Sequence, residues 1–175
     1  MNVNDTFDIR GETHIEVYKF RGGSIFVVTA LALILQPLLR VYLPKTAILD
    51  LPLLITVYFG LSRRNPSTGL LLGTVIGLLQ DSLSKSPLGL YGIAKTIIGY
   101  LASSIGARLD TEHPAARFAL TAVFFLLQQV IVVLIERLLL AHPGALFNMR
   151  IAIAAGVNGL VGVFVYFLLD RLRKS

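Results

Sequence analysis

The sequence predicts an all-α integral membrane protein with six transmembrane helices. The chain is 55% hydrophobic and 15% charged, with a mean hydropathy of +0.75, so it has too few polar residues to cover a soluble domain of 175 residues. Its apolar residues fall into six separate segments divided by short polar connections. The alternating pattern of barrel strands is absent. Because a chain in lipid must satisfy its own backbone hydrogen bonds, these segments are expected to be helices.

Each segment has expected bounds. Residues 1–23 are polar and predict a cytoplasmic tail, residues 24–170 the membrane domain, and residues 171–175 a basic cytoplasmic end. The apolar segments of the domain are residues 24–43, 48–61, 68–83, 88–106, 118–141 and 151–169. About 20 helical residues cross a hydrocarbon core of roughly 30 Å. The second segment is short, and runs of about 10 to 14 apolar residues are often re-entrant instead.

The basic residues indicate that the second segment also crosses the membrane. With six spans, ten Lys and Arg residues lie on the side of the two termini: Arg10, Lys19, Arg21, Arg63, Arg64, Arg108, Arg117, Arg171, Arg173 and Lys174. Five lie on the other side: Arg40, Lys45, Lys85, Arg137 and Arg150. Because basic residues concentrate in cytoplasmic loops, both termini are predicted inside the cell. Omitting the second span would weaken this asymmetry.

Glycines are spaced for close helix packing. Gly69, Gly73 and Gly77 recur at every fourth position of the third segment, and Gly92 and Gly99 belong to a small-residue face of the fourth. Neighbouring helix backbones approach closely at such positions. We expect packing within one bundle rather than between two copies. No Gly-Lys-Ser/Thr ending is present, so a phosphate-binding loop is not indicated.

Charged residues embedded near the outer ends of the segments predict a polar cluster. They are Arg40, Asp50, Asp81, Lys95, Glu136 and Arg137. Embedded charges usually pair, line a polar cavity or reach the interface. Lys95 is the deepest, about two turns from the outer end, and is expected opposite Asp81 or Glu136. The embedded amides Gln80, Gln128, Gln129 and Asn158 are expected to bridge helices.

Several classes of function are not indicated. The chain has no cysteine, and its three histidines fall in the tail and in loops on opposite faces, so no metal site is expected. No nucleophile with a paired base or acid cluster is apparent, so we expect no catalytic residue, no cofactor and no enzyme activity. The scattered basic residues do not form a nucleic-acid-binding stripe.

The central half of the chain resembles the MreD family. The resemblance is carried by GLLQDSLSKSPLGLYGIAKTIIGYL at residues 77–101, and before it by Leu49-Asp50-Leu51-Pro52, Tyr58, Arg63-Arg64 and Gly69. It implies a six-helix protein of the bacterial inner membrane, similar in fold to the substrate-binding subunits of energy-coupling-factor transporters. The 23-residue tail departs from the usually short N-terminus of the family.

The resemblance also implies partners. Family members form a complex with MreC and work with RodA, a class B penicillin-binding protein and, indirectly, MreB in peptidoglycan synthesis during rod elongation. The outer polar cluster and the turn from Asp81 to Gly92 would then receive the membrane-proximal part of MreC. The alternative is a substrate-capturing subunit of a small-molecule, vitamin-type transporter that uses the same outward cavity. Such a site would favour aromatic stacking, and the chain has no tryptophan.

Overall fold

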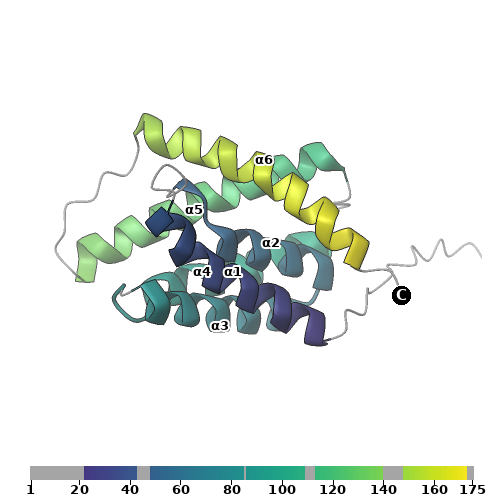
Figure 1. The fold of residues 1–175 in the computed structure, drawn as a ribbon, viewed down its shortest axis with the longest axis horizontal. Helices are drawn as coiled ribbons and strands as arrows, with labels where there is room; N and C mark the ends of the chain where they lie inside the picture. Colours follow the sequence, from purple (N-terminus) through teal and green to yellow (C-terminus); the bar gives the residue numbers. More distant parts are fainter. Residues whose placement is uncertain (1–21, 43–47, 85, 109–112, 140–147, 173–175) are drawn as a thin grey trace, which may run out of the picture.

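The computed structural model describes residues 22–42, 48–84, 86–108, 113–139 and 148–172. These ranges contain six α-helices and no strand (Figure 1). The helices are α1 (Gly22–Tyr42), α2 (Leu51–Arg63), α3 (Pro66–Ser84), α4 (Leu90–Gly106), α5 (Pro114–Leu139) and α6 (Met149–Leu172). The predicted tail, apart from its last two residues, lies outside the described ranges, as does the chain end after Leu172.

All six predicted helices are confirmed as helices. The largest shift is at the start of α5, which begins at Pro114, four residues before the predicted start at Phe118. Proline is favoured in a first helical turn because the amide it lacks has no helical partner there. Within the described ranges, two stretches are long and apolar enough to cross a membrane, Pro114–Leu138 and Met149–Arg171, whereas Ile25–Leu39 and Leu51–Arg63 are shorter apolar helices.

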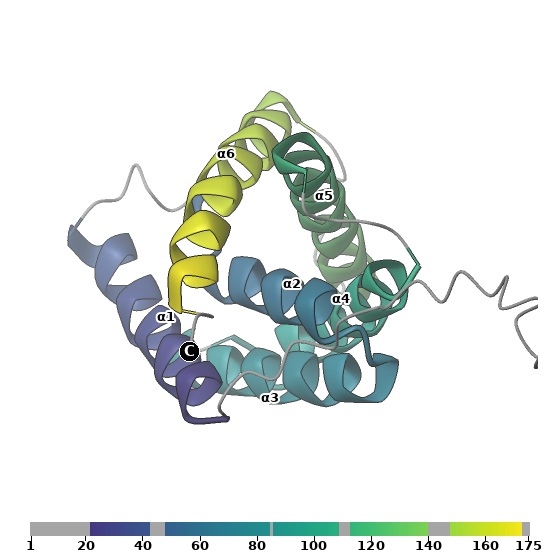
Figure 2. The ribbon, with the colours of Figure 1, turned by 90° about the vertical axis from the view of Figure 1, so that its right-hand side faces the viewer.

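Helix α2 is the centre of the bundle. It contacts α1, α3, α4, α5 and α6, and its residues from Pro52 to Leu61 are all buried. A helix that is apolar all round is typical of such an enclosed position. Figure 2 shows α5 and α6 on one side of α2 and α3 on the other. The short second segment therefore forms the core of the fold.

The outward faces of the bundle are strongly apolar. Phe26, Leu160 and Phe164 are each at least 69% exposed, while Lys95, Asn158 and Gln128 are at most 1% exposed. Soluble monomers rarely expose contiguous apolar surfaces, and they seldom bury charges. This inverted distribution is typical of a helical bundle surrounded by lipid.

Helices α3 and α4 form the most extensive contact in the bundle. A Cβ atom added at Gly73 would overlap the backbone carbonyl of Lys95, and one at Gly69 would overlap Ser103 and the carbonyl of Gly99. At Gly77 it would lie 2.7 Å from the Cα atom of Gly92. The glycine faces of α3 and α4 thus pack against each other within the chain. Helix α4 also packs directly on α2, where a Cβ atom added at Gly106 would overlap the carbonyl of Leu61.

Candidate functional site

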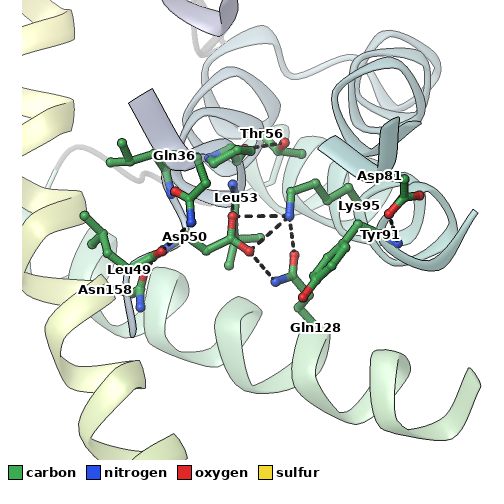
Figure 3. A network of polar contacts seen from close by, with 12 residues as sticks. Gln36, Leu49, Asp50, Leu53, Thr56, Asp81, Tyr91, Lys95, Gln128 and Asn158 are labelled. Carbon is green, nitrogen blue, oxygen red and sulfur yellow. Dashed lines mark hydrogen bonds and ion pairs between the residues drawn. The ribbon is translucent and has the colours of Figure 1, made fainter. Parts of the chain in front are cut away.

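A buried ion pair joins α4 to the start of α2. The Lys95 ammonium lies 3.2 Å from Oδ2 of Asp50, and neither side chain is more than 8% exposed. Gln128 on α5 completes the group: its Oε1 accepts from Lys95 Nζ at 2.7 Å, and its Nε2 donates to Asp50 Oδ2 at 2.7 Å. Figure 3 shows the three side chains converging from three segments of the chain. Each charge therefore has a partner in a region where an unpaired charge would be costly.

Asp50 is held in place by the start of α2. It is the N-cap residue, and its Oδ1 accepts a hydrogen bond from the backbone N–H of Leu53 at 3.0 Å. Pro52 occupies the first turn, where its missing amide costs nothing. The local sequence Asp50-Leu51-Pro52 thus begins the helix and fixes the carboxylate that Lys95 reaches.

Two further amides extend this network to α1 and α6. Asn158 Oδ1 accepts from the backbone N–H of Asp50 at 2.9 Å, and its Nδ2 donates to the carbonyl of Ile48 at 2.8 Å. On the other side, Gln36 Nε2 donates to the carbonyl of Leu49 at 2.7 Å, and Gln36 Oε1 accepts from the N–H of Leu51 at 2.9 Å. The connection before α2 is therefore clamped by α1 and α6. We call Gln36, Asp50, Lys95, Gln128 and Asn158 the buried polar network.

Asp81 has a different role from the expected one. Its carboxylate accepts the backbone N–H groups of Gly89, Tyr91 and Gly92 at 2.9, 3.0 and 3.0 Å. It thereby caps the N-terminus of α4, where helical amides have no internal partner. The turn requires Gly89, whose φ of 97° is in the left-handed region. Because Asp81 is directed at these amides, the carboxylate that meets Lys95 is Asp50, and the expected pairing with Asp81 or Glu136 is not the one found.

The remaining charged residues of the expected cluster lie elsewhere. Glu136 and Arg137 are in the last turn of α5, about 12 Å beyond Gln128 at 1.5 Å per residue, and Arg137 is exposed. They lie beyond the reach of the ion pair. The side chain of Arg40 is outside the described part of the structure. Among the members of the expected charged cluster whose side chains the structure describes, Asp50 and Lys95 form an ion pair.

The four embedded amides do not all bridge helices as expected. Gln128 and Asn158 bridge helices, as described above. Gln80 is buried in α3, and neither atom of its amide has a hydrogen-bond partner among the described residues. Gln129 is half-buried and lines a cavity.

A second polar group at the opposite end of α5 and α6 was not anticipated. Arg117 Nη1 donates to Asp170 Oδ2 at 2.6 Å, and the Tyr58 hydroxyl donates to Asp170 Oδ1 at 2.9 Å. One turn further in, the hydroxyls of Thr121 and Tyr166 lie 3.0 Å apart. These contacts tie α2, α5 and α6 together. The available signal was the opposite charge of Arg117 and Asp170 at the facing ends of two consecutive helices.

A cavity of about 240 Å³ adjoins the buried polar network. Its walls come from the connection before α2 and from α4, α5 and α6: Ile48, Leu49, Asp50, Tyr91, Phe125, Gln128, Gln129, Arg150, Ile151 and Ala154. The lining combines a carboxylate, amides, a phenol and a guanidinium with aliphatic and aromatic walls, a composition suited to orienting a small amphipathic group. In the described ranges, no three His, Cys, Asp or Glu side chains are grouped so as to hold a metal ion.

Comparison with known proteins identifies the family. A family model described as rod shape-determining protein MreD matches residues 20–172. No curated protein and no solved structure matches the chain. The matched range includes the buried polar network, the Asp81 cap and the glycine contact of α3 with α4. Because the match extends over nearly the whole chain, this protein belongs to the MreD family of membrane proteins, which functions in the determination of rod shape.

Proposed function

We propose that the protein is a non-enzymatic membrane scaffold of the cell-elongation machinery that binds MreC. Through that complex it would act with RodA and a class B penicillin-binding protein in peptidoglycan synthesis, and indirectly with MreB. Family membership supports the general role in rod shape. The specific partners are those that the resemblance to MreD implies.

The buried polar network is the observation that carries this proposal. Asp50 accepts from Lys95, Gln128 and the backbone of Leu53, so its charge is engaged within the bundle. The network connects α1, α2, α4, α5 and α6. Fully satisfied polar networks rigidify a core and specify one arrangement of helices. A rigid frame is the property that a scaffold requires.

We further propose that all six helices span the inner membrane with both termini in the cytoplasm. The charge asymmetry of the loops and the apolar outward faces support this topology. It places the buried polar network and the cavity toward the extracytoplasmic end, and the Arg117–Asp170 pair toward the cytoplasm. A fold like that of the substrate-binding subunits of energy-coupling-factor transporters remains part of this proposal.

The decisive experiment is recovery of the tagged full-length chain from native membranes, followed by mass spectrometry of its partners. We expect MreC to be enriched above the level found with an unrelated six-helix membrane protein carrying the same tag. RodA and the penicillin-binding protein should follow at lower yield because they bind through the complex. Absence of any single-pass partner with an extracytoplasmic domain would contradict the scaffold function.

The transporter alternative has one observation in its favour, the cavity beside Asp50 and Gln128. A volume of 240 Å³ is below the usual range of about 300 to 1,000 Å³ for sites that bind drug-sized molecules. A transporter subunit would retain a small molecule of defined mass through purification in mild detergent. A scaffold would retain a protein partner instead, so native mass spectrometry of the same preparation separates the two functions.

A further inference from the structure

The cavity contains a cation without a counterion among the described residues. Arg150 is exposed in the first turn of α6 and lines the cavity. No carboxylate in the described ranges lies within ion-pair distance of its guanidinium. The other charge in the lining, Asp50, is neutralised by Lys95. The cavity therefore has a net positive character and favours an anion.

Polar groups around Arg150 strengthen that preference. Gln129 on α5 is half-buried and adds an amide to the lining, and Tyr91 on α4 adds a phenol. The N-terminus of α6, which Asn148 caps through the N–H of Ile151, adds the positive end of a helix dipole. A carboxylate is a suitable ligand because a guanidinium can hold both of its oxygens with two parallel hydrogen bonds.

The size and walls of the cavity indicate what carries the carboxylate. A volume of about 240 Å³ is below the range of about 300 to 1,000 Å³ that holds a drug-sized molecule, so the cavity suits a side chain better than a helix. Phe125, Ile48 and Ile151 supply apolar contact for the methylene groups of such a side chain. The walls come from four segments of the chain, and the cavity they form is partly open.

We propose that this cavity is an anchor site for an acidic side chain, Asp or Glu, from the membrane-proximal extracytoplasmic segment of the protein partner. The guanidinium of Arg150 binds the carboxylate, Gln129 donates to it, and the buried polar network forms a rigid floor below. The inference rests on the proposed scaffold function, and it specifies the chemistry by which the outer face recognises its partner.

The first test compares three variants of the full-length chain recovered from native membranes. Arg150→Glu should lower partner recovery by about tenfold or more, because it sets two like charges against each other in a partly enclosed site. Arg150→Lys should retain part of the binding, since a point charge replaces a bidentate donor. The matched control is Met149→Glu, which adds an acid at the adjacent exposed residue outside the cavity and should leave recovery within about twofold of the unmodified chain.

A cross-linking experiment then identifies the occupant. A photoreactive phenylalanine analogue in place of Gln129 should cross-link to a partner peptide that contains Asp or Glu. The control places the same analogue at Val130, which is 47% exposed and is not part of the cavity lining, and should not give that product. Changing the identified acid to Lys should restore recovery by the Arg150→Glu variant, because the charges are then exchanged.

The outcomes separate this inference from the function on which it rests. If the unmodified chain recovers no single-pass partner, the scaffold function fails and this anchor site fails with it. If the unmodified chain and the Arg150→Glu variant recover the partner equally, the anchor site alone is wrong. A small anion that is lost from the Arg150→Glu variant while partner recovery stays constant would also overturn it, and would assign the cavity to a free ligand.

Discussion

Replacing Lys95 by methionine should destabilise the bundle more than any conservative change at an exposed position. The substitution keeps most of the side-chain volume but removes the ammonium that lies 3.2 Å from Asp50 and 2.7 Å from Gln128. Asp50 would be left buried, at 6% exposure, with a negative charge that only neutral donors contact. Breaking one side of a buried pair typically costs about 3 to 5 kcal/mol.

The same structure predicts a smaller loss when both charges are removed. In the variant Asp50→Asn/Lys95→Met, the amide of position 50 can still cap α2, because asparagine is as good an N-cap as aspartate. Replacing a buried ion pair by uncharged groups of similar shape is often close to neutral. The double variant should therefore be more stable than Lys95→Met alone, with a coupling energy of about 2 kcal/mol or more between the two positions.

The assay is equilibrium unfolding of the purified chain in mixed detergent micelles, followed by far-ultraviolet circular dichroism because the chain has no tryptophan. The four proteins of the cycle are measured under one set of conditions, so that detergent effects cancel. A loss below about 1 kcal/mol for Lys95→Met, or a double variant that is as unstable as the sum of the single variants, would refute the claim that this pair is mutually dependent.

Two further predictions concern the contact of α3 with α4. Gly73→Ala should destabilise the bundle by about 1 to 3 kcal/mol in the same unfolding assay, because its methyl group would overlap the carbonyl of Lys95. The control is Gly156→Ala, where an added Cβ atom meets nothing within 4 Å. This control should be neutral or slightly stabilising. Asp81→Ala should lower the free energy of unfolding by about 2 kcal/mol, because three backbone amides at the start of α4 lose their acceptor. Hydrogen exchange should show faster opening of that turn. The control Ser82→Ala removes only a hydrogen bond to the carbonyl of Leu78 and should leave exchange in the turn unchanged.

The sequence by itself determined the number and type of the elements. The apolar segments were long enough, and their polar breaks clear enough, to predict all six helices, because hydrophobic clustering is a local property of the chain. The glycines at positions 69, 73 and 77 likewise marked the face by which α3 packs. The second segment was expected to begin at residue 48, whereas α2 begins at Leu51, although Asp50 followed by a proline in the first turn is a local signal for a helix start.

Only the tertiary structure decided which charges meet. Asp50 and Lys95 are 45 residues apart, Asp50 and Gln128 are 78 residues apart, and Arg117 and Asp170 are 53 residues apart. Their pairing depends on how the helices cross and rotate, which periodicity does not specify. Asp81 and Glu136 were the expected partners of Lys95 because all three lie toward the outer ends of their helices, but the turn through Gly89 directs Asp81 to backbone amides. The short second helix takes the central position for the same kind of reason: burial depends on the neighbours that surround a helix, and its own length does not encode them.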